Sequence, residues 1–192
     1  RRQRQMCIRD RSSSLSFSSD AVTLNFGAVA KGYISDEMKK VLEEEGVTSA
    51  LMSLGGNVMT LGTKPDGSSW TVAITDPFSP ESLMGSVTVT GQAVVTSGNY
   101  EKYFEENGKR YHHILDPCTG APSESDVVST TIIADKSIDC DALSTATFLM
   151  GADAGMQLID SLDGIEAVFI QSDGSVVTSK HIDKYQLQVN NS

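Results

Sequence analysis

Cysteine is scarce in this sequence of 192 residues, which contains only Cys7, Cys118 and Cys140. Three cysteines without a C-x-x-C spacing fit neither a disulfide-rich scaffold nor a cysteine-based zinc site. Long apolar runs are also missing, because no stretch approaches the roughly 20 residues that a membrane-spanning helix requires. The sequence therefore predicts a globular domain that depends on an ordinary hydrophobic core.

Positive charge is in short supply as well. Fifteen Lys and Arg residues stand against 25 Asp and Glu residues, which gives a formal net charge of -10 at pH 7. Binding to nucleic acid requires Lys and Arg clustered on one face, so we expect no nucleic-acid partner. Hydrophobic residues make up 39% of the chain, which is enough to form a packed core.

The first eleven residues differ in composition from the rest, since they hold five of the six arginines. Three interpretations are a basic tail, a targeting segment, or sequence that is not native to the gene. A secretory signal needs an apolar stretch of about 7–15 residues after the positive charges, whereas a serine-rich stretch follows here. We favour the non-native interpretation for residues 1–11, and expect a domain over 12–180 followed by a tail over 181–192.

Hydrophobic spacing predicts many short strands and a few helices. Helices are expected from Ile34 to Gly46, over 141–150 before Gly151, and over 153–162. Asn107-Gly108 between two alternating segments predicts a β-hairpin over 100–115. Strands and helices do not alternate regularly, which favours an α+β fold with a mostly antiparallel sheet and packed helices. The other strands are expected at 22–24, 50–54, 58–61, 70–75, 87–89, 93–95, 127–134, 167–171 and 176–177.

Asp141 and Thr145 form the most informative pair. They are four residues apart, so on a helix a carboxylate and a hydroxyl share one face. Two such oxygens beside a helix N-terminus suit Mg²⁺ together with a phosphate group. The alternative is a helix cap followed by an ordinary helical threonine.

Small residues surround Lys31 in the segment 25–33, which reads N-F-G-A-V-A-K-G-Y. They would let the backbone approach a ligand closely, and Lys31 offers a positive charge to a phosphate. The segment has the spacing of neither a P-loop nor a Rossmann fingerprint. The alternative is a tight junction before a helix, with Lys31 in solvent.

His112 and His113 end the second strand of the expected hairpin. Neighbouring residues on a strand point to opposite faces, so only one of the two is expected to face a given site. A structural role at a sheet edge is the alternative for either. Gly55-Gly56 and Ser97-Gly98 lie in further glycine loops at strand ends, which are typical of turns.

In this order the motifs resemble the ApbE family, the FAD:protein FMN transferases, with their T-fold-like α+β domain. Five stretches carry the resemblance, over about residues 20–175: N-F-G-A-V-A-K-G-Y at 25–33, L-M-S-L-G-G-N at 51–57, T-S-G-N-Y at 96–100, H-I-L-D-P-C-T-G at 113–120 and D-A-L-S-T at 141–145.

The resemblance implies a Mg²⁺-dependent transfer of FMN from FAD to a Thr or Ser hydroxyl of a target flavoprotein, with release of AMP. It implies that Asp141, Thr145 and the carbonyl of Ala28 bind the metal, and that His113 acts in catalysis. It also implies that FAD is bound by Lys31, Gly55, Gly56, Ser97 and Gly98.

The chain departs from the family pattern at its start. Family members carry a longer N-terminal part that completes the FAD site, so we expect this chain to be an N-terminally truncated member. The resemblance implies an exported lipoprotein of the bacterial cell envelope, although neither a signal sequence nor a lipid-attachment motif is present in the chain. Two other functions are an FAD pyrophosphatase that yields FMN and AMP, and a catalytically silent flavin-binding fragment.

Overall fold

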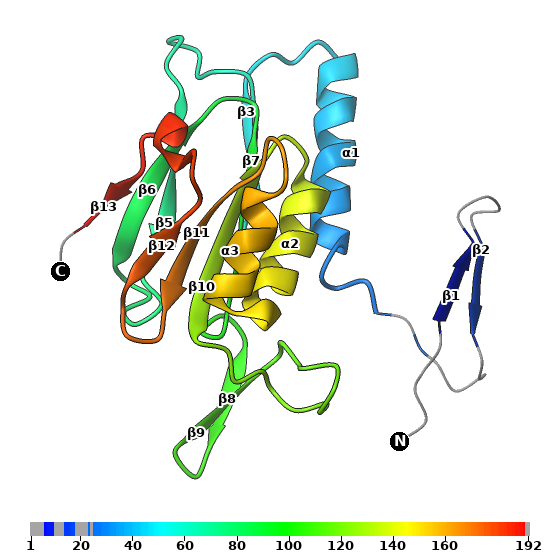
Figure 1. Cartoon of the computed structure of the whole chain (residues 1–192). Helices are drawn as coiled ribbons and strands as arrows, with labels where there is room; N and C mark the ends of the chain where they lie inside the picture. Colours follow the sequence, from blue (N-terminus) through cyan, green and yellow to red (C-terminus); the bar gives the residue numbers. More distant parts are fainter. Residues whose placement is uncertain (1–5, 10–13, 18–22, 24, 191–192) are drawn as a thin grey trace.

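A six-stranded antiparallel sheet forms the centre of the fold (Figure 1). The computed structural model describes residues 6–9, 14–17, 23 and 25–190. Every neighbouring pair in this sheet is antiparallel. Its strands, in spatial order, are β12 (Val176–Thr178), β11 (Glu166–Gln171), β10 (Val127–Ala134), β7 (Ala93–Gly98), β4 (Asn57–Leu61) and β3 (Ala50–Leu54).

Three helices cover one face of this sheet, and a second sheet covers the other. Helix α2 packs on β7 and β10, α1 packs on α2 and β4, and α3 packs on α2 and β11. The second sheet has the order β13-β6-β5. The bounds of these elements are α1 (Ala30–Glu44), α2 (Ser137–Met150), α3 (Ala152–Asp160), β5 (Trp70–Thr75), β6 (Leu83–Val89) and β13 (Gln188–Val189).

The core consists of two apolar layers, one on each face of the large sheet. Met59, Cys140 and Phe169 belong to the layer under the helices, whereas Ile74 and Val168 belong to the layer between the two sheets. All eight residues of β10 are buried, because the strand is covered on both faces. The expected α+β fold with mostly antiparallel sheets is confirmed.

Two smaller hairpins complete the architecture. β1 (Met6–Arg9) pairs with β2 (Ser14–Phe17), so part of the basic segment 1–11 forms a strand. β8 (Tyr103–Glu106) pairs with β9 (Lys109–His112) around Asn107-Gly108, which have positive φ angles of 52° and 74°. This is the predicted hairpin. The strand expected at 22–24 lies outside the described residues except for Thr23.

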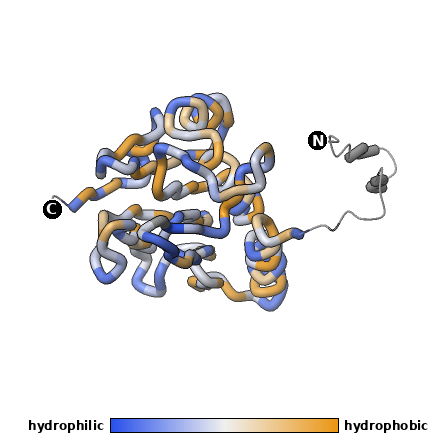
Figure 2. The backbone as a smooth tube through the Cα atoms, turned by 90° about the horizontal axis from the view of Figure 1, so that it is seen from below, coloured by the Kyte–Doolittle hydropathy of each residue, from blue (hydrophilic) through white to orange (hydrophobic). Residues whose placement is uncertain are grey.

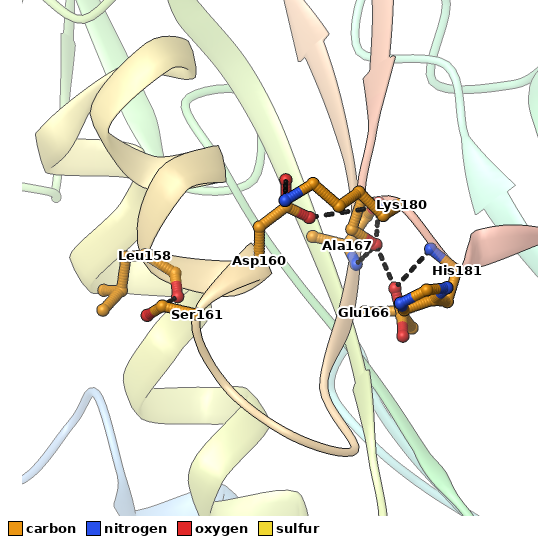
Figure 3. A network of polar contacts seen from close by, with 8 residues as sticks. Leu158, Asp160, Ser161, Glu166, Ala167, Lys180 and His181 are labelled. Atoms are coloured by element: carbon orange, nitrogen blue, oxygen red, sulfur yellow. Dashed lines mark hydrogen bonds and ion pairs between the residues drawn. The ribbon is translucent and has the colours of Figure 1, made fainter.

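Residues 182–189 pack on the domain, although the sequence suggested a tail over 181–192. A short 3-10 helix (Ile182–Tyr185) buries its first and last side chains against the layer between the sheets, and β13 pairs with β6. Figure 3 shows how the segment before this helix is held. The carboxylate of Glu166, only 4% exposed, accepts hydrogen bonds from Ser179 Oγ at 2.5 Å and from the backbone N–H of His181 at 3.2 Å.

One face of α1 is apolar and exposed. Tyr33, Ile34, Met38 and Val41 are all exposed on it, and hydrophobic segments follow the turns of this helix in Figure 2. The opposite side of α1 packs on α2 and β4. No helix in the described part of the chain combines the length and the hydropathy needed to cross a membrane.

Candidate functional site

A pocket of about 430 Å³ opens where α1 begins, along α2 and at the base of the β8–β9 hairpin. Six of the nine site residues expected from the sequence line it, from four separate stretches of the chain. The lining residues are Asn25, Gly27, Ala28, Lys31, Thr96, Ser97, Glu101, Lys102, His113, Ile114, Leu115, Asp141, Thr145 and Leu149.

Asp141 is held by the close approach of α1 and α2. Its side chain is 3% exposed, and Oδ2 accepts a hydrogen bond from the backbone N–H of Gly32 at 2.9 Å. A Cβ atom on Gly32 would lie 2.5 Å from the carbonyl oxygen of Ser137. Glycine at this position therefore allows the contact that places the carboxylate.

The sequence placed Asp141 and Thr145 beside a helix N-terminus, and this expectation is wrong. α2 begins at Ser137, so Asp141 lies a full turn inside the helix. The backbone N–H groups of Ser137 and Ile138 donate to the Asp36 carboxylate at 2.8 and 2.9 Å. A carboxylate from α1 therefore occupies the end of α2 that would otherwise attract an anion.

The N-terminal end of α1 faces the pocket instead. Its N-cap residue, Val29, makes no side-chain capping bond, and Gly27, Ala28 and Lys31 line the pocket at this end. Backbone N–H groups in the first turn of a helix attract anions, and the Asp141 carboxylate accepts the one on Gly32. The ammonium of Lys31 adds positive charge there, and its Nζ donates to the carbonyl of Gly55 at 3.0 Å.

Hydroxyl groups connect α2 to β7 beside Asp141. Ser97 Oγ lies 2.8 Å from Ser144 Oγ and 3.4 Å from Thr145 Oγ1. Ser144 Oγ donates to the carbonyl of Asp141 at 3.0 Å. These contacts fix the orientation of the half-buried Thr145 side chain, which lines the pocket with Asp141.

These residues fit a hard cation such as Mg²⁺. Asp141 is a buried carboxylate on the pocket wall that accepts from a neutral N–H, and none of the ion pairs found in the described part of the chain includes it. A buried anion needs a compensating positive charge. Mg²⁺ prefers oxygen ligands and commonly uses only one or two carboxylates, and Ala28 and Thr145 supply further oxygens on the same pocket. Among residues 25–190 no three His, Cys, Asp or Glu side chains form a metal-binding cluster.

Gly55, Gly56 and Gly98 do not line the pocket. Gly55 and Gly56 form the tight turn between β3 and β4, with positive φ angles of 54° and 92°. A Cβ atom on Gly56 would lie 3.3 Å from Oε1 of Glu101. A Cβ atom on Gly98 would overlap the ring of Tyr100. These three glycines therefore make room for the turn and for neighbouring side chains behind the pocket wall.

The two adjacent histidines point to different environments, as the strand geometry predicts. His112 is buried with its ring edge-on to Phe148, and its Nε2 lies 3.0 Å from the carbonyl of Ser123. Burial lowers the pKa of His112. His113 is exposed, lines the pocket, and has Nδ1 3.2 Å from the carbonyl of Lys102.

Sequence reasoning missed Glu101 and Lys102, which also line the pocket. They directly follow the T-S-G-N-Y motif, and this adjacency was the only available signal. Desolvation by the surrounding chain raises the pKa of the Glu101 carboxyl, although the nearby charges of Lys31 and His113 act in the opposite direction. The pocket therefore combines two carboxylates with two lysines and a histidine.

The turn after His113 is held by Asp116. Its Oδ1 accepts the backbone N–H of Cys118 at 2.7 Å, and its Oδ2 accepts the hydroxyl of Thr119 at 3.1 Å. The hydrogen bond from the Cys118 N–H is the main reason why the pKa of Asp116 lies below its ordinary value. Ile114 and Leu115, which come between this turn and His113, reach the pocket.

Comparison with known proteins matches residues 2–169 to the family model described as the ApbE family. The chain belongs to the ApbE family. The matched range includes residues 2–11, most of the basic segment.

An FAD:protein FMN transferase of Klebsiella pneumoniae (strain 342) is 38% identical over 179 residues, which is 93% of this chain and 55% of the relative. An FAD:protein FMN transferase of Treponema pallidum (strain Nichols) is 40% identical over 168 residues, which is 83% of this chain and 46% of the relative.

Solved ApbE structures agree with this assignment. The ApbE protein of Thermotoga maritima superposes with a TM-score of 0.82 at 30% identity, over 94% of this chain and 58% of that protein. The flavinyl transferase ApbE of Pseudomonas stutzeri superposes with a TM-score of 0.77 at 34% identity, over 94% of this chain and 56% of that protein. This ApbE-family chain thus spans about half the length of the curated relatives that it matches.

Proposed function

We propose that the protein transfers FMN from FAD to a Ser or Thr hydroxyl of a target flavoprotein, with Mg²⁺ as the cofactor and AMP as the second product. The observation that carries the proposal is one pocket that brings together Lys31, His113, Asp141 and Thr145. Relatives named FAD:protein FMN transferase support it.

Binding of the FAD diphosphate is the first requirement of this reaction. The N-terminal end of α1 and the ammonium of Lys31 offer positive charge at one end of the pocket. Asp141, Thr145 and the carbonyl of Ala28 would hold Mg²⁺ beside it. When bound, the metal supplies positive charge to the diphosphate and to the departing AMP.

The transfer step replaces the phosphoanhydride bond between the FMN and AMP halves of FAD with a phosphoester bond to the acceptor. The acceptor hydroxyl oxygen forms a bond to the phosphorus of the FMN half, and the bond from that phosphorus to the bridging oxygen of AMP breaks. AMP leaves with the electron pair of the broken bond. The proton of the hydroxyl must be removed, and positioning with charge neutralisation supplies most of the catalysis.

His113 is suited to take that proton. A carbonyl oxygen only accepts hydrogen bonds, so the contact between His113 Nδ1 and the carbonyl of Lys102 assigns the ring proton to Nδ1. Neutral His113 then has an unprotonated Nε2, which can accept the proton of the acceptor hydroxyl. The carbonyl of Lys102 also keeps the ring oriented during the step.

The remaining parts of the proposal rest on the family resemblance. We place the full protein in the bacterial cell envelope, as an exported lipoprotein facing the periplasm or the cell exterior. Its acceptor would be a flavoprotein subunit with a Ser or Thr flavinylation site. Membrane association would arise only through a lipid anchor.

A titration of the chain with FAD, with and without Mg²⁺, tests the proposal. Flavin fluorescence reports binding and chromatography reports AMP. We expect Mg²⁺ to tighten FAD binding and AMP to appear only when Mg²⁺ is present. Free FMN formed together with AMP, even when an acceptor protein is supplied, would instead identify an FAD pyrophosphatase. Binding without any AMP would identify a silent flavin-binding domain.

A further inference from the structure

The β8–β9 hairpin has one face that leads directly out of the pocket. Phe104 and Tyr111 lie opposite each other in the register, and their rings stack at 5.1 Å with an interplanar angle of 9°. His113 directly follows β9 and continues its pairing, so its side chain lies on the same face as that of Tyr111, two residues earlier. The carbonyl of Lys102, two residues before Phe104, accepts the backbone N–H of His113. The Phe104–Tyr111 pair therefore lies next to Lys102 and His113 on the same face of the hairpin.

Phe104 and Tyr111 belong to neither of the two apolar layers of the core. Phe104 is 62% exposed, and both strands of the hairpin pair only with each other among the described elements. In Figure 1 the hairpin projects from the lower end of the molecule, away from the helices and the large sheet. An exposed aromatic side chain on a projecting hairpin is typical of an interaction site.

We propose that this face of the hairpin binds the polypeptide segment of the acceptor protein that carries the reactive hydroxyl. The inference rests on the proposed function, because a protein hydroxyl must reach His113. A strand advances about 3.3 Å per residue, so the Phe104–Tyr111 pair lies about 7 Å along the face from His113. An extended segment with its hydroxyl at His113 therefore places a residue two positions away on the aromatic pair.

The chemistry of the surface favours an extended segment with an apolar side chain at that position. The stacked rings offer a flat apolar contact, and Lys102 adds a positive charge between this contact and the pocket. Residues 102–113 contain three basic and two acidic residues in a chain with a net charge of -10. The hairpin therefore does not share the negative charge of the chain as a whole.

Phe104→Ser tests the proposal, with Tyr103→Ser as the matched control. Tyr103 is an aromatic residue of the same strand, 47% exposed, and it lies on the opposite face under the guanidinium of Arg110, 4.1 Å from the ring centroid. The probe is a purified apo-flavoprotein domain that the Klebsiella pneumoniae relative flavinylates. Calorimetry measures its binding to each variant without FAD, and flavin fluorescence measures FAD binding separately.

We expect Phe104→Ser to weaken acceptor binding about tenfold, as removal of a central aromatic contact does. Tyr103→Ser should stay within about twofold of the wild type, and Phe104→Tyr should restore binding. Equal losses in both serine variants, no loss in Phe104→Ser, or no acceptor binding by the wild type would overturn the inference. A parallel loss of FAD affinity in Phe104→Ser would also overturn it, since the hairpin would then bind the flavin.

The same experiment separates this inference from the proposed function. A wild-type chain that binds the acceptor domain through Phe104 but attaches no flavin to it contradicts the transferase proposal and leaves the docking surface in place. A chain that attaches flavin equally well with and without Phe104 contradicts the docking surface alone.

Discussion

The backbone N–H of Gly32 on α1 donates a hydrogen bond to Oδ2 of Asp141 on α2, across 109 residues of sequence. The small residues around Lys31 were expected to admit a ligand close to the backbone. At Gly32 the close neighbour is instead the backbone of Ser137 and Ile138. The motif thus places the carboxylate of the pocket by allowing two helices to meet, while Gly27 and Ala28 still line the pocket.

Gly32→Ala should therefore damage both stability and the site. The added methyl group would overlap the backbone of α2, and overpacking of this kind costs about 1–3 kcal/mol. Separation of the two helices would also displace Asp141. Urea unfolding measures the first effect and Mg²⁺-dependent FAD binding the second. Lys40→Ala, at an exposed position of the same helix, is the control. If Gly32→Ala has the same free energy of unfolding as the wild type, α1 can shift to accommodate the methyl group without loss of stability.

Asp141→Asn should abolish the dependence of AMP release on Mg²⁺. The amide keeps the size of the side chain but removes the negative charge that a hard cation requires. Loss of several kcal/mol of charge stabilisation corresponds to a rate at least about 100-fold lower. Asp139→Asn, two residues earlier and exposed on the same helix, should behave like the wild type. An unchanged rate in Asp141→Asn would remove this residue from the metal site.

His113→Ala should slow flavin transfer more than it weakens FAD binding. Loss of a general base typically costs about 10²–10⁴-fold in rate, whereas the exposed ring contributes little to the pocket wall. Single-turnover transfer and FAD titration measure the two quantities separately. If the transfer rate and the FAD affinity fall by the same factor, His113 is a binding residue and not a base.

His112 should make the fold less stable in mildly acidic solution. Burial lowers the pKa of His112 in the folded protein from its ordinary value of 6.5. As the pH falls through 6.5 toward the lower folded value, the unfolded chain binds a proton that the folded protein does not, and the free energy of unfolding decreases. His112→Gln should show a smaller decrease between about pH 7.5 and pH 5.5 in urea unfolding. An identical decrease in both proteins would assign the effect to other groups.

The sequence predicted what depends on local patterns. The antiparallel α+β fold, the hairpin around Asn107-Gly108 and the opposite orientations of His112 and His113 all follow from alternation, turn chemistry and strand geometry. The family resemblance named nine site residues, of which six line one pocket and Gly55, Gly56 and Gly98 do not. Only the fold shows which of these residues come together in space.

What the sequence could not predict depends on contacts between distant segments. The start of α2 is capped by Asp36, 101 residues earlier, so the local sequence gives no sign of it. β10 contains Ser129, Thr130 and Thr131, yet all three are buried. Thr130 Oγ1 donates to the carbonyl of Ser144 at 2.6 Å, a partner that becomes adjacent only once α2 packs on the sheet.

We propose that this pocket moves FMN from FAD to a protein hydroxyl. The most direct measurement incubates the chain with FAD, Mg²⁺ and the apo-flavoprotein domain, and records the intact mass of the domain together with the AMP formed. We predict that the domain gains one FMN group for each AMP released, and that chelation of Mg²⁺ prevents both. An unchanged domain, whether AMP forms or not, would show that the protein is not an FMN transferase for this acceptor.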